Sequence, residues 1–222
     1  MLQNNTAIPT RIQIRNSVGI VLMEIFSQTK GVTTLMSSNT NPSEFEIVTE
    51  FYEVMDEPIP TPGPATLDPE VIPEKRLRLK MNLIAEEFAE LVEAVYGKEA
   101  EQIILKAYKK AVKADDGTRD AVKTLDALAD LVVVQNGLAI EARMPVYKAL
   151  QEVHLSNLSK LDPETGEAIR SDGVTPALHD GEVKPEGKIL KGSAYFEPDL
   201  EAIVEGREPD RTPLLEKMKT ES

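Results

Sequence analysis

The chain of 222 residues carries a formal net charge of -13 and contains no cysteine. A surface this acidic repels nucleic-acid backbones and anionic membranes, so neither is expected as a partner. The lack of cysteine excludes disulfides, thiol catalysis and cysteine-based zinc sites, and two histidines are too few for a histidine-rich metal site. No apolar run approaches the roughly 20 residues of a membrane span. The composition fits a reducing, cytoplasmic location.

Residues 1–42 show no sustained periodicity, and we interpret them as a mostly disordered leader. Within it, the apolar stretch 18–26 faintly resembles a signal peptide. Glu24 interrupts that stretch, however, and no small-residue cleavage site follows it. Met36 is an alternative start, because the residues after it suffice for every predicted element.

The rest of the chain predicts an all-α protein, with one domain over residues 43–200. Ser43 is a plausible cap for a first helix, and a proline-rich loop over residues 58–73 follows. Gly97 ends the second helix, and Thr118 is expected to cap the fourth. The expected helices cover residues 44–57, 74–96, 98–113, 118–142 and 145–158. A long irregular loop (162–198), a short helix after Pro198 and a charged tail (201–222) complete the chain.

The second helix carries three glutamates on and beside one stripe. At about 100° per residue, Glu86 and Glu90 point away from an apolar face, and Glu87 lies a quarter-turn round. That face is predicted to be the core side, with Leu77, Ile84, Phe88, Leu91 and Val95. Leu79 and Leu83 share the glutamate stripe, so this side is also expected to be packed. Like charges four residues apart destabilise a helix. A metal site and a solvated acidic face are about equally supported by spacing alone.

The fourth helix places Asp126 and Asp130 one turn apart among leucine and valine residues, which indicates a buried helix. An ionised aspartate there costs several kcal/mol unless it is paired or bound to a metal. An ion pair with Arg76 or Arg78 is one explanation. Two stripes of carboxylates on separate helices favour a hard divalent cation, Mg²⁺ or Mn²⁺.

Five sequence pieces, in order, resemble the all-α nucleoside triphosphate pyrophosphohydrolases, a superfamily that includes MazG, the dimeric dUTPases and phosphoribosyl-ATP pyrophosphohydrolase. Residues 86–90 read as its EExxE motif. The stretch 152–160 is similar to "EVHxSNxSK" of one MazG-like branch. The other pieces are Val48-x-x-Phe51, residues 128–131 with Gly137, and residues 187–192 with Tyr195 and Pro198.

The resemblance implies a MazG-like helical bundle that is completed by a homodimer or homotetramer. It implies Mg²⁺-dependent cleavage of a (d)NTP to (d)NMP and pyrophosphate, in house-cleaning of the nucleotide pool. The implied metal ligands are Glu86, Glu87, Glu90 and Asp130, with Glu87 also as the base. The implied nucleotide contacts are Asn157, Lys160, Lys188, Lys191 and Tyr195.

Two features depart from the family pattern. The second motif usually reads ExxD, but this chain has Ala127 where the glutamate is expected. Asp126, one residue earlier, is the substitute metal ligand, and the number of metal ions stays open. Residues 173–186 form an insertion in the loop that is expected to close over the phosphates.

Two alternative functions remain. One is the phosphoribosyl-ATP pyrophosphohydrolase of histidine biosynthesis, which shares the acidic motifs but usually lacks the "EVHxSNxSK" stretch and the closing-loop piece at residues 187–198. The other is a non-catalytic helical dimer that binds a metal or a partner, which Ala127 and the insertion favour.

Overall fold

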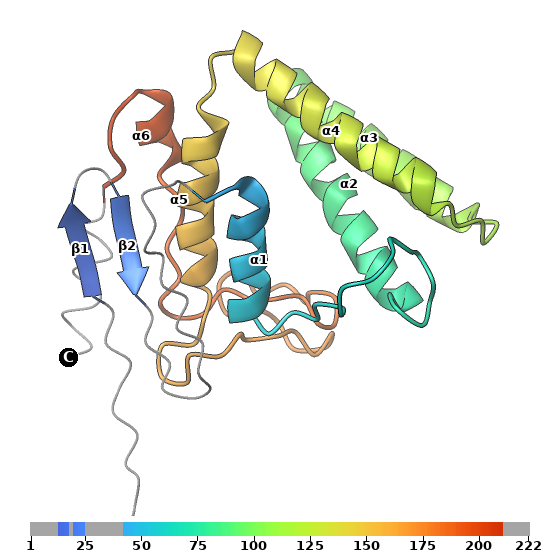
Figure 1. Cartoon of the computed structure of the whole chain (residues 1–222), viewed down its shortest axis with the longest axis horizontal. Coiled ribbons are helices and arrows are strands. Elements are labelled where there is room, and N and C mark those ends of the chain that lie inside the picture. The colour runs from blue at the N-terminus through green and yellow to red at the C-terminus, as the bar shows by residue number, and fades with distance from the viewer. Residues whose placement is uncertain (1–12, 18–19, 25–41, 211–222) are drawn as a thin grey trace, which may run out of the picture. The chain divides into compact units, whose positions relative to one another are not determined.

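The computed structural model describes residues 13–17, 20–24 and 42–210 (Figure 1). Strands β1 (Gln13–Ser17) and β2 (Ile20–Glu24) form an antiparallel hairpin inside the stretch predicted as a disordered leader, so that prediction does not hold for these residues. The rest of that stretch, with Met36, lies outside the described residues. All other regular elements are helices, as predicted. In the part of the chain that the structure describes, no helix has the length and apolarity needed to cross a membrane.

The stretch predicted as one domain divides into two compact units. The first unit comprises Met1–Ile59 and Leu138–Ser222, and the second comprises Pro60–Gly137. The proline-rich loop lies almost wholly in the second unit and contains no helix before residue 74, as expected.

The first unit is built around two packed helices, α1 (Glu44–Val54) and α5 (Val146–Leu158) (Figure 1). Ser43 begins α1 as predicted, because its hydroxyl accepts the N–H of Glu46 while the Glu46 side chain accepts the N–H of Ser43. The short helix α6 (Leu200–Val204) packs on α5 and buries Ala202 and Ile203. The region assigned to a charged tail therefore begins with part of the folded unit.

Helix α5 buries a row of polar side chains, which are Glu152, His154, Ser156 and Ser159. His154 Nε2 lies 2.9 Å from Glu50 Oε2 on α1. Glu152 accepts the backbone N–H of Asp199 at 3.0 Å. The two serine hydroxyls bind the carbonyl and the N–H of Phe196. These hydrogen bonds attach α1, the end of the long loop and the start of α6 to one helix.

The irregular loop over residues 162–198 is ordered by short antiparallel bridges, at Leu161–Ala168, Arg170–Ile189 and Pro176–Val183. Arg170 connects this loop to the end of α1. Its guanidinium donates to the Glu57 carboxylate at 2.7 Å and to the Met55 carbonyl at 2.6 Å. The Glu57 side chain is buried, whereas the Arg170 side chain is 33% exposed.

The second unit contains α2 (Glu74–Tyr96), α3 (Lys98–Lys113) and most of α4 (Ala121–Glu141). Gly97 separates α2 from α3 with φ of 92°, a left-handed conformation that glycine adopts readily. Asp120, and not the predicted Thr118, provides the first-turn hydrogen bond of α4, because its carboxylate accepts the N–H of Lys123. The N–H of Thr118 is instead held by Asp116 in the preceding turn.

The prediction that the apolar face of α2 lies in the core is wrong for the single chain. Phe88 is 51% exposed and Val95 is 58% exposed, whereas Ala89 is buried. The connection at Gly97 lays α3 along the side of α2 that carries Asn82 and Ala89, and Tyr108 of α3 donates to Asn82 at 2.8 Å. Leu79 and Leu83 are half-buried, so the glutamate stripe is indeed partly packed. The apolar face on the other side of α2 stays uncovered.

We expect Arg170→Ala to lower the free energy of unfolding by about 2–3 kcal/mol, because it removes a guanidinium from a buried carboxylate and from the end of α1. Urea unfolding followed by circular dichroism measures this change. Arg207→Ala is the matched control, since Arg207 pairs with Glu205 at the surface, and its effect should stay below about 0.5 kcal/mol. Equal effects of the two substitutions would contradict this role for Arg170.

Candidate active site

The three glutamates of the EExxE motif lie within two turns of α2. Glu86 is half-buried, and Glu87 and Glu90 are exposed. Glu86 lies on the side toward α3, where it acts on Tyr108. Burial raises the pKa of the Tyr108 hydroxyl; the positive charge of Arg78 opposes the rise, and the negative charge of Glu86 adds to it. The side of α2 toward α3 therefore carries the Glu86 carboxylate and the Asn82 amide, and the Tyr108 hydroxyl of α3 donates to that amide.

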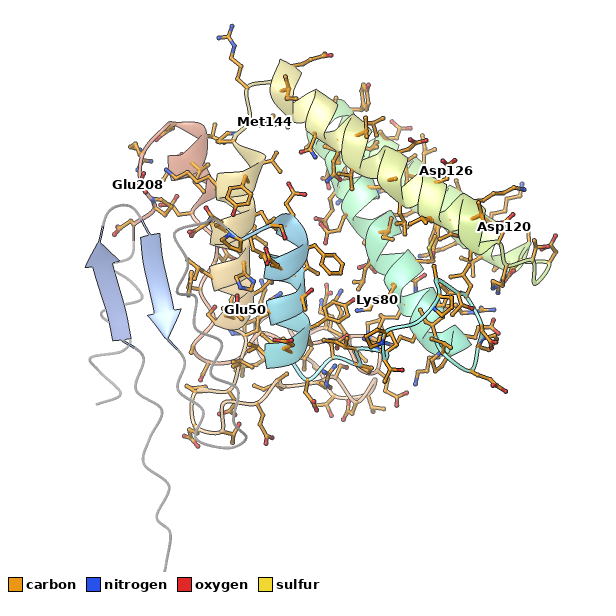
Figure 2. The ribbon with its side chains drawn as sticks, in the orientation of Figure 1. Glu50, Lys80, Asp120, Asp126, Met144 and Glu208 are labelled. Atoms are coloured by element: carbon orange, nitrogen blue, oxygen red, sulfur yellow. The ribbon has the colours of Figure 1, made fainter. Side chains whose placement is uncertain are left out.

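The two aspartates of α4 are exposed, which corrects the prediction that this helix is buried. Asp126 lies partway along α4, and Asp120 lies at its start (Figure 2). Leu131 is 45% exposed and Val133 is 68% exposed, since no described helix covers these sides of α4 in the single chain. In one chain alone, Asp130 is therefore not forced by burial to pair with another group.

A single chain does not assemble the predicted metal site from Glu86, Glu87, Glu90, Asp126 and Asp130. Among the described residues, no group of three or more acidic or histidine side chains is placed to hold a metal ion. The donor chemistry does fit Mg²⁺, because all five groups are carboxylates and four of them are exposed. The metal site therefore stays a prediction.

The alternative partner Arg78 is engaged elsewhere in the second unit. Its guanidinium lies 2.7 Å from Glu74 and 3.8 Å from Asp115. Arg119 also binds Asp115 through two nitrogen atoms, and this contact is the main reason that the pKa of Asp115 lies well below its usual range. Neither ion pair of Arg78 involves the two aspartates of α4.

The predicted nucleotide contacts form two local pairs in the first unit. Lys160 Nζ donates to Asn157 Oδ1 at 2.6 Å, at the end of α5. Lys191 Nζ lies 4.4 Å from the centre of the Tyr195 ring. Gly192 brings the two pairs close, because a Cβ atom there would lie 3.0 Å from the carbonyl oxygens of Lys160 and Leu161.

Lys188, the remaining predicted contact, is half-buried in the same loop, and its carbonyl accepts the N–H of Ser171. The five candidate nucleotide contacts thus belong to the first unit, and the five candidate metal ligands belong to the second.

Sequence reasoning missed several residues that shape these elements. It assigned no role to His154, whose contact with Glu50 joins α5 to α1. It also missed Tyr108 with Asn82, and Arg170. Tyr108 is a polar aromatic residue in an otherwise charged and aliphatic helix, which is a weak signal. Glu57 and Met55, which Arg170 binds at the end of α1, lie over 100 residues away in the sequence, so spacing carries no signal for them.

Comparison with known proteins identifies the helical region. Residues 48–157 match the model of the family described as phosphoribosyl-ATP pyrophosphohydrolase. This region belongs to the all-α NTP pyrophosphohydrolase superfamily. All five candidate metal ligands and Asn157 lie within the match, whereas Lys160, Lys188, Lys191 and Tyr195 follow it.

The fold of the chain is also found in a crystal structure. A protein from Exiguobacterium sp. 255-15, provisionally assigned as an NTP pyrophosphohydrolase, superposes with a TM-score of 0.50 at 20% identity. The match covers 82% of this chain and 100% of that one. At this identity the likeness shows the fold alone. No curated protein matches the sequence.

Asp172, just before the insertion, has a pKa lowered to about 2, because it accepts the Thr175 hydroxyl and the N–H groups of Thr175 and Val174. A lowered pKa in the folded state stabilises the fold above the unfolded value of about 4, and this contribution is lost as the pH falls toward 2. Carbon-13 NMR titration of the aspartate carboxyls should give a midpoint near 2 for Asp172. A midpoint near 4 would contradict these hydrogen bonds.

Proposed function

We propose that this protein is a Mg²⁺-dependent nucleoside triphosphate pyrophosphohydrolase that cleaves a (d)NTP to a (d)NMP and pyrophosphate. The observation that carries the proposal is the placement of all five candidate metal ligands on α2 and α4 of one unit, inside the region that matches the family. The MazG-like pieces at the end of α5 and in the loop favour a triphosphate over phosphoribosyl-ATP. Nucleotide-pool house-cleaning is the corresponding role.

The carboxylates Glu86, Glu87, Glu90, Asp126 and Asp130 would hold the metal. When bound, Mg²⁺ would neutralise phosphate charge and lower the pKa of a coordinated water molecule. This is important for an acidic protein, since its own charge repels the substrate. Mn²⁺ accepts the same oxygen ligands and is expected to replace Mg²⁺.

The residues of the chain would carry the remaining steps. Water attacks the α-phosphorus, the bond to the bridging oxygen breaks, and pyrophosphate leaves. Glu87, which is exposed and offset from the Glu86–Glu90 stripe, would accept the proton of the attacking water. Lys160, beside Asn157, would contact the phosphates together with Lys188 and Lys191.

We also propose that the chain acts as a homodimer or homotetramer. The support is the apolar surface of α4 opposite Asp130, where Leu125 is 60% exposed and Leu128 and Val132 are each 46% exposed. Patches of this kind on a soluble chain usually mark an interface.

Activity is tested with purified protein, Mg²⁺ and a panel of triphosphates that also contains phosphoribosyl-ATP. We expect pyrophosphate release from at least one triphosphate. Glu87→Gln should lower kcat by at least about 100-fold, the usual effect of losing a general base. Asp130→Asn should weaken Mn²⁺ binding as measured by electron paramagnetic resonance. Glu99→Gln, an exposed acid on α3, is the control and should change neither quantity.

The panel also separates the competing functions. Turnover of phosphoribosyl-ATP alone would support the histidine-biosynthesis activity that the name of the matching family suggests. Mn²⁺ or nucleotide binding without turnover would support a non-catalytic binding protein. No pyrophosphate from any triphosphate would contradict the proposed function.

Assembly is tested by light scattering coupled to size exclusion. The wild-type molar mass should be two or four times that of one chain. Leu125→Glu should shift the protein toward the monomer, because it places a charge in the proposed interface. Val174→Glu is the control, since Val174 is 76% exposed in the insertion, which belongs to the first unit. A monomeric wild type would contradict the assembly.

A further inference from the structure

The insertion over residues 173–186 folds into a closed turn of its own. Pro176 and Val183 form an antiparallel bridge, and the N–H of Ala177 donates to the Glu182 carbonyl at 2.8 Å. Ala177 is buried, which anchors the turn to the rest of the first unit. The insertion is therefore an ordered part of this unit and presents His179 in a defined place.

His179 contacts the segment that carries two of the candidate nucleotide residues. Its Nε2 lies 2.8 Å from the carbonyl oxygen of Gly192. Its ring packs edge-to-face on Tyr195, with the ring centres 5.7 Å apart and the planes at 77°. The Gly192 carbonyl also accepts the N–H of Tyr195 at 3.1 Å. One histidine thus binds both ends of the turn from Gly192 to Tyr195.

The turn from Gly192 to Tyr195 is in contact with Lys191 and with the backbone of Lys160. Lys191 Nζ lies over the Tyr195 ring at 4.4 Å, and Gly192 fits closely against the carbonyl of Lys160. A shift of the turn would therefore move Lys191 directly and loosen its packing against the end of α5. The insertion reaches the predicted phosphate contacts through His179.

The charges around Lys191 leave its ammonium suited to an anionic ligand. Asp180, next to His179, is held by Lys184 Nζ at 2.7 Å, and the charge of Lys191 contributes less than this contact to lowering the pKa of Asp180. The Lys191 ammonium lies over an aromatic ring, which offsets a positive charge only weakly. Its side chain is exposed, so a phosphate group can reach it.

From these contacts we infer that His179 is a positioning residue, which fixes the turn from Gly192 to Tyr195 and thereby holds Lys191 and Lys160 for the phosphates of a nucleoside triphosphate. The phosphate part of this inference rests on the proposed function. The placement of the turn by His179 stands apart from it. The insertion then serves substrate binding.

Four variants of the full chain separate the contributions of His179. His179→Ala removes the hydrogen bond and the ring, His179→Gln retains a donor for the Gly192 carbonyl, and His179→Phe retains a ring for Tyr195. Leu178→Ala is the control, because Leu178 is 78% exposed in the same insertion. Each variant is studied by hydrogen–deuterium exchange of residues 187–196, and by KM and kcat for the best triphosphate of the panel.

We expect His179→Ala to raise exchange in residues 187–196 and to raise KM by about tenfold, the combined effect of losing one hydrogen bond and one ring pair, with kcat within about twofold. His179→Gln and His179→Phe should each restore part of both effects, and Leu178→Ala should match the wild type. Unchanged exchange or unchanged KM in His179→Ala would overturn the inference, as would an equal effect of Leu178→Ala.

The two readouts keep the proposals distinguishable. A wild type that releases no pyrophosphate contradicts the proposed function. The exchange measurement requires no substrate, and in that case it decides by itself whether His179 places the turn.

Discussion

The first unit depends on one constraint, which is that the polar side chains buried on α5 each require a hydrogen-bond partner. A buried polar group without a partner costs more than a satisfied one contributes. His154 therefore fixes α1 through Glu50, and Glu152 fixes the start of α6 through the backbone of Asp199. The serines of the same helix fix Phe196. The end of the long loop thus lies beside Asn157 and Lys160, where the candidate nucleotide contacts meet.

In the second unit, by contrast, the single chain leaves apolar surface uncovered. Helix α4 exposes leucine and valine side chains on several sides, and α2 exposes Phe88 and Val95. The same two helices carry every candidate metal ligand. In the proposed assembly, burial of this apolar surface would supply the free energy of association.

The long loop shows how irregular sequence can still be ordered. Its glycines and prolines rule out a helix, but side chains such as Asp172 close tight turns, and Arg170 ties the loop to the end of α1. His179 adds a contact from within an insertion that departs from the family pattern. The insertion thus contributes a contact to the turn at Gly192 that the motifs of the family do not contain.

The helices, the caps at Ser43 and Gly97 and the family of residues 48–157 could be predicted from the sequence, because periodicity, capping and motifs are local properties of the chain. Which faces of the helices are covered depends on how the helices pack. The turn at Gly97 placed α3 against the side of α2 that bears Ala89, so the face expected in the core stayed exposed. Likewise, the partners of Arg170 and His179 follow from the path of the loop, and residue spacing does not encode that path.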